Sequence, residues 1–153
     1  DDIASSEYLT SILKVKESPA PYFDLLEEYK MQSAVKALIQ TGLINAAHDI
    51  SDGGLYVSLV EMGLPNRLGF DITGDAAVRE DAFLFGEAQG RVIVALDGNN
   101  EEDVIEELSK HGVPFFLLGH VTRGKMMVDD VHFGFIDDAA EVYLNTLGNK
   151  MNQ

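Results

Sequence analysis

The chain has 153 residues, 46% of them apolar, and a formal net charge of −15. That length and apolar content are enough for a globular domain with a buried core. Its 11 Lys and Arg residues are far fewer than its 26 Asp and Glu. This disfavours binding to nucleic acid or to anionic membranes, because both need clustered basic side chains. The absence of cysteine, of a membrane-length apolar run and of a signal-peptide pattern predicts a cytoplasmic protein.

An arm or linker is expected over residues 1–22, since a short amphipathic stretch there runs into two prolines. A single domain is expected over residues 23–153. Within it, Asp24 is predicted to be the N-cap, or an acid in the first turn, of a helix that Gly42 ends. Further helices are predicted over residues 55–62, 79–88, 101–111 and 138–147, and strands over 43–48, 69–72, 91–96, 114–121, 125–128 and 131–135.

Helices and strands interleave along the chain, which predicts an α/β or α+β fold around one mixed sheet. The strand over residues 43–48 is expected to be buried, because it is short and apolar. The helix over 101–111 lies between two predicted strands, and the sequence does not decide whether those strands pair. Asn100 and Asp103 resemble a capping box for this helix.

The stretch AAHDISDGGLYVSLVEM, residues 46–62, places acidic and hydroxyl side chains before two glycines and a predicted helix. A phosphate can bind the unpaired N–H groups of a helix N-terminus, and glycine permits its close approach. Asp52 would repel that phosphate, and so would Asp49, unless a divalent cation lay between the carboxylates and the phosphate. Asp49 as a Mg²⁺ ligand and Ser51 as a hydrogen-bond donor would therefore form a nucleotide-phosphate site. The N–H groups of Gly53 and Gly54 would complete it.

The same pattern also fits simple helix capping, with Asp52 or Ser51 as the cap and the glycines only turning the chain. Spacing alone leaves both interpretations open, and neither common glycine-rich phosphate fingerprint is present. His48 beside the motif is interpreted as a structural residue. Glu87 and Arg91 are interpreted as a local ion pair, with a charged pair at a domain interface as the alternative. No nucleophile–histidine arrangement stands out, so no catalytic residue is assigned.

The stretch AHDISDGGL, followed by VSLVEM, closely resembles the second-half signature of phosphoribosylformylglycinamidine synthases, of the aminoimidazole ribonucleotide synthetase superfamily. SSEYL at 5–9 resembles that family's Ser-Glu-Tyr segment, with Ala4 and Ser5 where glycines are common. LFGEAQGRVIVAL at 84–96 and LGHVT at 118–122, followed by GKMMV, resemble its Glu-x-x-x-Arg strand entry and its closing strands. The resemblance covers nearly the whole chain and matches it to the last C-terminal-type domain of the fused synthetase polypeptide.

The resemblance implies a three-layer α/β/α fold and a ligase that converts formylglycinamide ribonucleotide to the amidine in purine biosynthesis. Its cofactors would be ATP and Mg²⁺, with ammonia derived from glutamine. The catalytic histidine and the phosphate-binding lysine would lie in missing N-terminal-type domains of the same polypeptide. We therefore expect a piece of a longer protein that is inactive alone. A glutaminase subunit and a small accessory subunit are the implied partners, with no fused glutaminase domain after Gln153.

By resemblance, Asp49 matches the family's Mg²⁺-binding aspartate and Ser51 its nucleotide-contacting serine. Gly53 and Gly54 match its glycine turn. Because the two halves of the family's polypeptide are pseudo-symmetric, the site is expected to bind nucleotide either for catalysis or structurally. The alternatives are a non-catalytic packing or interaction domain, or another ATP-using superfamily member such as a thiamine-phosphate kinase or a selenophosphate synthetase.

Overall fold

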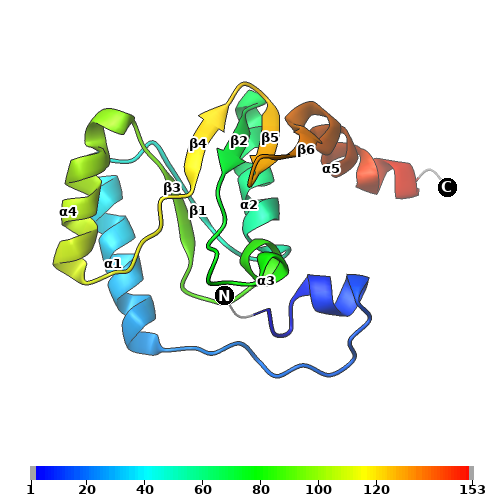
Figure 1. Ribbon diagram of the computed structural model, residues 1–153, viewed down its shortest axis with the longest axis horizontal. Coiled ribbons are helices and arrows are strands. Elements are labelled where there is room, and N and C mark those ends of the chain that lie inside the picture. The colour runs from blue at the N-terminus through cyan, green and yellow to red at the C-terminus, as the bar shows by residue number, and fades with distance from the viewer. Residues whose placement is uncertain (1–2, 152–153) are drawn as a thin grey trace. The chain divides into compact units, whose positions relative to one another are not determined.

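The computed structural model describes residues 3–151, and its helices and strands confirm the predicted α/β class. The helices are α1 (Leu25–Thr41), α2 (Gly54–Gly63), α3 (Glu80–Phe85), α4 (Glu101–His111) and α5 (Ile136–Met151) (Figure 1). The strands are β1 (Ala46–Asp49), β2 (Gly69–Ile72), β3 (Val92–Ala95), β4 (Gly119–Thr122), β5 (Lys125–Val128) and β6 (Val131–Phe135). The chain divides into two compact units. The first runs to Ser58 and resumes over Asp81–Leu117, and the second comprises Leu59–Glu80 and the residues from Leu118 onward.

The strands form two sheets rather than the single mixed sheet that the sequence predicted. In the first unit β1 pairs with β3 in antiparallel register, with Asp49 opposite Val92. In the second unit the order is β4-β2-β5-β6, where β2 and β5 are parallel and the other pairs antiparallel. The strands before and after α4 do not pair. The predicted strand over 114–121 is reduced to β4, and Pro114 has no N–H to donate to a ladder.

Strand β1 is mostly exposed, which corrects the prediction of a buried strand over residues 43–48. Ala46, Ala47 and Asp49 are all exposed, and the strand begins three residues later than predicted. Among the described residues β1 pairs with β3 alone, so its other edge has no neighbouring strand. Apolar composition predicted the strand correctly but not its burial.

The core of the first unit lies between α1 and α4, which run side by side (Figure 1). Ala34 and Leu38 on α1 have no exposed area, and Val104 and Leu108 on α4 are nearly as buried. The members of each pair are four residues apart, so they lie on the same face of their helix. The two helices therefore pack together through the buried side chains on these faces.

Both predicted ends of α1 are confirmed. The Asp24 carboxylate accepts hydrogen bonds from the backbone N–H groups of Leu26 and Glu27, at 2.8 and 3.0 Å. The bonds from Glu27 and then Leu26 lower the pKa of Asp24, because they favour its charged form. Gly42 ends the helix with a φ of 70°, in the left-handed region that favours glycine.

The predicted capping box of α4 is wrong. Asn100 has φ −97° and ψ 0° and makes no side-chain cap, because capping geometry needs an extended backbone. Its side-chain amide instead donates to the Leu43 carbonyl at 3.2 Å. A 3-10 turn, Gly98–Asn100, precedes α4, and Asp97 caps that turn by accepting the Asn99 N–H at 2.9 Å.

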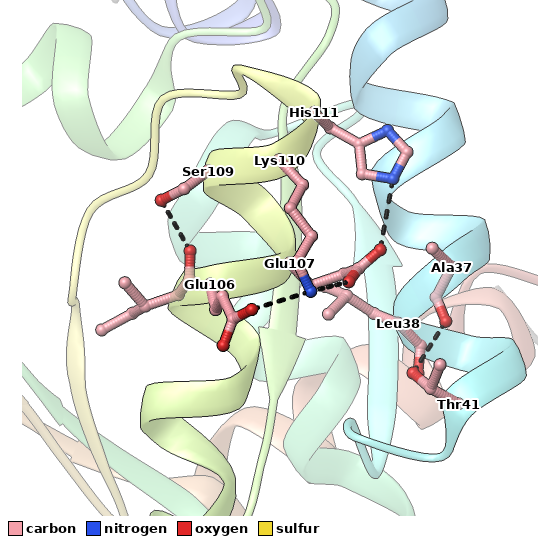
Figure 2. A network of polar contacts seen from close by, with 9 residues as sticks. Ala37, Leu38, Thr41, Glu106, Glu107, Ser109, Lys110 and His111 are labelled. Atoms are coloured by element: carbon pink, nitrogen blue, oxygen red, sulfur yellow. Dashed lines mark hydrogen bonds and ion pairs between the residues drawn. The ribbon is translucent and has the colours of Figure 1, made fainter.

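Figure 2 shows a polar network at the carboxyl end of α4. The Lys110 ammonium lies 3.0 Å from a Glu106 oxygen and 3.3 Å from a Glu107 oxygen, and these bonds raise the pKa of Lys110. His111 Nε2 lies 3.4 Å from Glu107. Positive charge is favourable in the last turn of a helix, and surface pairs of this kind contribute little stability. We therefore assign the network a structural role.

The core of the second unit is built from alternating positions of its sheet and from the start of α5. Phe70 and Ile72 on β2 and Met126 and Val128 on β5 are at most 4% exposed, as the period of two along a strand predicts. Ile136 on α5 is 1% exposed. The predicted hairpin of β5 and β6 is confirmed. Within residues 3–151, no helix has the length and apolar character needed to cross a membrane.

Candidate functional site

The motif singled out in the sequence forms the connection between β1 and α2, in the first unit. Strand β1 ends at Asp49, whose side chain is 80% exposed. The hydroxyl of Ser58, a residue only 1% exposed, lies 3.3 Å from the Asp49 carbonyl oxygen and 3.0 Å from that of Gly54. Ser58 thus ties the end of the strand to the first turn of the helix. Sequence analysis missed this residue, although a polar side chain four residues after Gly54 in an apolar run was a usable signal.

The two glycines of the motif are required by backbone geometry. Gly53 and Gly54 have φ of 86° and 72°, in the left-handed region. A Cβ on Gly54 would lie 2.7 Å from two backbone atoms of Phe85, and such a contact cannot be relieved by rotating a side chain. A Cβ on Gly53 would lie 2.5 Å from a methyl group of Val57. The turn therefore packs closely against α3.

The N–H groups of both glycines are engaged within the chain. Gly54 donates to the Ser51 carbonyl at 3.0 Å, and Gly53 donates to Glu87 Oε1 at 2.8 Å. The side chains of Ser51 and Asp52 are exposed, and neither makes a hydrogen bond among the described residues. The turn therefore presents side chains, rather than free N–H groups, to a ligand.

The prediction that Asp52 or Ser51 caps α2 is wrong. Helix α2 begins at Gly54, so the residue in the capping position is Gly53, which has no side chain. Asp52 lies one residue further out, and the left-handed Gly53 turns the backbone between it and the helix. This removes the direct support for the capping interpretation of the motif.

Glu87 and Arg91 do not form the ion pair that their spacing suggested. Within residues 3–151, Glu87 accepts the N–H groups of Gly53 and Glu7, at 2.8 and 2.9 Å. The Arg91 guanidinium donates to the Gly86 carbonyl. Burial lowers the pKa of Arg91, and its Nε atom is buried without a described partner. Each charged group binds backbone instead of the other.

His48 lies beside the motif on β1. Its Nδ1 atom is 2.6 Å from the Asp49 carbonyl oxygen and 4.0 Å from an oxygen of the Asp49 carboxylate. These local contacts are consistent with the structural interpretation.

The segment before α1 contacts the motif through α3 and the residues after it. The Tyr8 ring stacks on Phe85 with centroids 4.9 Å apart and planes 10° apart, and Tyr56 of α2 lies 6.1 Å from the same ring. Ser5 closes the segment into a loop, since its hydroxyl donates to the Pro19 carbonyl at 2.8 Å. The segment thus lies against the candidate site. The boundary of an arm at residue 22 and a single domain beyond it stay predictions.

An open groove of about 540 Å³ lies between α1 and the β1–β3 pair, and Asp49 is part of its lining. Its other lining residues are Glu28, Met31, Gln32, Val35, Lys36, Ile39, Gln40 and Val92. The exposed lining is largely apolar, and it includes the basic group of Lys36 and the carboxylates of Glu28 and Asp49.

Asp49 is the carboxylate predicted to hold a metal ion at this turn. Among residues 3–151, no three His, Cys, Asp or Glu side chains converge as a metal cage. Mg²⁺ is commonly held by one or two carboxylates together with phosphate oxygens and waters, rather than by a cage of protein ligands. The exposed carboxylate of Asp49 fits that mode of binding.

The fold and the site define an α/β domain whose candidate ligand-binding turn joins a strand to a helix through two left-handed glycines. Residues 4–131 match the family described as AIR synthase related protein, C-terminal domain. The chain belongs to this family.

The relatives agree with this assignment. The phosphoribosylformylglycinamidine synthase subunit PurL of Salinibacter ruber is 45% identical over 123 residues, which are 79% of this chain and 16% of that protein. The PurL subunit of Zymomonas mobilis is 39% identical over 127 residues, 82% of this chain and 17% of that protein. The chain thus spans about a sixth of the length of these relatives.

Structures of Thermotoga maritima PurL share the fold. PurL complexed with FGAR has a TM-score of 0.70 at 17% identity, over 84% of this chain and 23% of that one. PurL complexed with ATP has a TM-score of 0.68 at 18% identity, over 77% of this chain and 22% of that one. At this level of identity the similarity establishes the fold.

Proposed function

We propose that this chain is a domain of a phosphoribosylformylglycinamidine synthase, the ATP-dependent ligase that converts formylglycinamide ribonucleotide (FGAR) to the amidine in purine biosynthesis. The observation that carries the proposal is the family match over residues 4–131, together with 45% identity to a PurL subunit. The Thermotoga maritima complexes with FGAR and with ATP support the same substrates. The reacting groups would come largely from the rest of the polypeptide.

Within that enzyme, this domain would supply one wall of a Mg²⁺–nucleotide site. Asp49 would bind the cation through its exposed carboxylate, and the Ser51 hydroxyl would donate to a phosphate oxygen. Gly53 and Gly54 would contribute by leaving room for the nucleotide beside the turn, since their N–H groups are already engaged. Bound Mg²⁺ would offset the negative charge of the phosphates.

The partners would be the other domains of the same polypeptide, a glutaminase subunit that supplies ammonia, and a small accessory subunit. A structure of PurLQS from Thermotoga maritima matches this chain with a TM-score of 0.64 at 17% identity. The net charge of −15 supports the need for these partners, because the basic groups that bind phosphate would come from the other domains. A cytoplasmic location fits the proposed pathway.

Amidine formation from FGAR, ATP, Mg²⁺ and ammonium tests the proposal. We expect turnover by the full polypeptide and none by the 153-residue chain alone. The matched control is the full polypeptide without ATP. Turnover by the isolated chain would contradict its assignment as one domain of the enzyme, and a full polypeptide inactive toward FGAR would contradict the proposed reaction.

A further inference from the structure

The chain contains two aspartate–glycine steps, Asp52–Gly53 and Asp97–Gly98, and no asparagine–glycine step. An aspartate that precedes glycine can rearrange, because glycine has no side chain to hinder attack by its own backbone nitrogen on the aspartate carboxyl carbon. In a folded chain this attack depends on whether the glycine nitrogen is free and on where the carboxyl group lies. The two steps differ in the first of these and in how closely the turn is packed.

At Asp52–Gly53 the glycine nitrogen is occupied. Its N–H donates to Glu87 Oε1 at 2.8 Å, so a carboxylate from another part of the chain lies in the direction from which the nitrogen would attack. The turn is also closely packed, since Gly54 is buried and a Cβ on Gly53 would lie 2.5 Å from a methyl group of Val57. Attack at this step therefore requires a hydrogen bond to a charged acceptor to break and the turn to open.

At Asp97–Gly98 the glycine is free. Residues 97–99 are exposed, and within residues 3–151 the Gly98 N–H makes no hydrogen bond. Asp97 Oδ1 accepts the Asn99 backbone N–H at 2.9 Å and the Asn99 side-chain amide at 2.6 Å. The first of these bonds closes a ring that includes the Gly98 nitrogen, which keeps the Asp97 carboxyl group beside that nitrogen. The attacking nitrogen and the carboxyl group are therefore held near each other in an open turn.

We propose that Asp97 is a site of spontaneous isomerisation to isoaspartate, and that the fold protects Asp52 from the same reaction. In the first step the Gly98 nitrogen forms a bond to Asp97 Cγ, and one carboxyl oxygen leaves as water with the amide proton and one solvent proton. The product is a five-membered succinimide ring. Water then opens this ring at the main-chain carbonyl carbon of Asp97, which gives isoaspartate, or at Cγ, which restores aspartate.

Isomerisation changes the connection between β3 and α4. The peptide linkage moves from the main-chain carbonyl carbon of Asp97 to Cγ, so the main chain becomes longer by one carbon atom. The side-chain carboxylate that caps the turn Gly98–Asn100 is lost, and the former main-chain carbonyl becomes a free carboxylate. This is the group that isoaspartyl methyltransferases methylate, so the modified chain would be a substrate for a repair enzyme of that class. The inference does not depend on the proposed function.

The experiment ages the full polypeptide at neutral pH and measures isoaspartate in two of its peptides. Trypsin, which cleaves after lysine and arginine, releases residues 37–67 with Asp52 and residues 92–110 with Asp97. Isoaspartate is detected by labelling with an isoaspartyl methyltransferase and by chromatographic separation of the two peptide forms. We expect about tenfold more isoaspartate at Asp97 than at Asp52 in the folded polypeptide, because the hydrogen bond to Glu87 must open before Asp52 reacts. In guanidinium chloride the two steps should react at similar rates.

Gly98→Ala is the matched control variant. A Cβ on Gly98 meets nothing within 4 Å and its backbone is not left-handed, so alanine fits the folded turn. Its methyl group hinders attack by the nitrogen, so the variant should lose most of the isoaspartate in residues 92–110 and keep the Tm of the wild type. Equal accumulation at both aspartates in the folded polypeptide overturns the inference, and so does a ratio that unfolding leaves unchanged. Isoaspartate that persists in residues 92–110 of the variant places the reaction at another residue and also overturns it.

Discussion

Alanine at Gly54 should destabilise the chain far more than alanine at Gly42, although both glycines are left-handed, with φ of 72° and 70°. At Gly42 an added Cβ meets nothing within 4 Å, so the cost is backbone strain alone. That strain is about 1 kcal/mol, after the gain from a stiffer unfolded chain is subtracted. The stability lost in Gly42→Ala therefore measures the cost of backbone strain alone.

At Gly54 the same Cβ would lie 2.7 Å from backbone carbons of Phe85 and 2.8 Å from the Leu84 carbonyl oxygen. Overpacking of this kind adds about 1–3 kcal/mol, because α3 or the turn must shift as a body. The total for Gly54→Ala is then about 3 kcal/mol. In a chain of this size that corresponds to a fall in Tm of about 6–12 °C, against about 2–4 °C for Gly42→Ala.

The assay is thermal unfolding of the 153-residue chain, followed by far-ultraviolet circular dichroism at equal protein concentrations. The difference between the two variants isolates the close approach of the turn to α3. If both variants lose the same amount of stability, the close contact between the turn and Phe85 is contradicted.

Two further predictions concern α1. Leu38→Ala should lower the free energy of unfolding by about 2–5 kcal/mol, because it opens a cavity in the α1–α4 core. In a urea titration, Ile39→Ala should lower the free energy of unfolding much less than Leu38→Ala, because Ile39 is 58% exposed. Equal losses in the two variants would contradict the assigned core. Asp24→Ala should destabilise the chain at pH 7 through loss of the cap. The pKa of Asp24 is lowered in the folded chain. The stability that the Asp24 cap contributes is therefore fully present above the pKa of the unfolded chain, near 4, and is lost as the pH falls through the pKa of the folded chain. The gap in urea midpoint between wild type and Asp24→Ala should therefore close in acid, and a gap that does not depend on pH would contradict the cap.

Helix ends were predictable where the signal was local. Asp24 and Gly42 each act through their own side chain or backbone within one turn of α1, and both predictions are confirmed. Asn100 failed because the preceding 3-10 turn fixed its backbone outside the capping region. Asp52 failed because the left-handed Gly53 lies between it and the start of α2 at Gly54, and turns the backbone there. In both failures the residue type was right and the backbone geometry, which spacing does not specify, was different.

The sequence located the candidate site but did not predict the long-range contacts that hold it. The order of Asp49, Ser51 and the glycines identified the turn between β1 and α2. The contact of Gly53 with Glu87, 34 residues away, depends on how α3 lies against the turn, and no local pattern encodes that. The division of the strands into two sheets likewise depends on long-range pairing rather than on the period of each strand.

The most direct test of the proposed site is the affinity of the full polypeptide for Mg²⁺–ATP in Asp49→Asn compared with Asp52→Asn. Both substitutions remove one exposed carboxylate from the same turn, and only the Asp49 carboxylate is assigned to the cation. We expect Asp49→Asn to weaken binding by about tenfold or more, a ratio that corresponds to about 1.4 kcal/mol. Asp52→Asn should bind within about twofold of the wild type, because the Asp52 carboxylate is exposed and is not assigned to the cation, and salt partly screens its charge. Equal affinities in the two variants would contradict the assignment of Asp49 as the metal-binding residue.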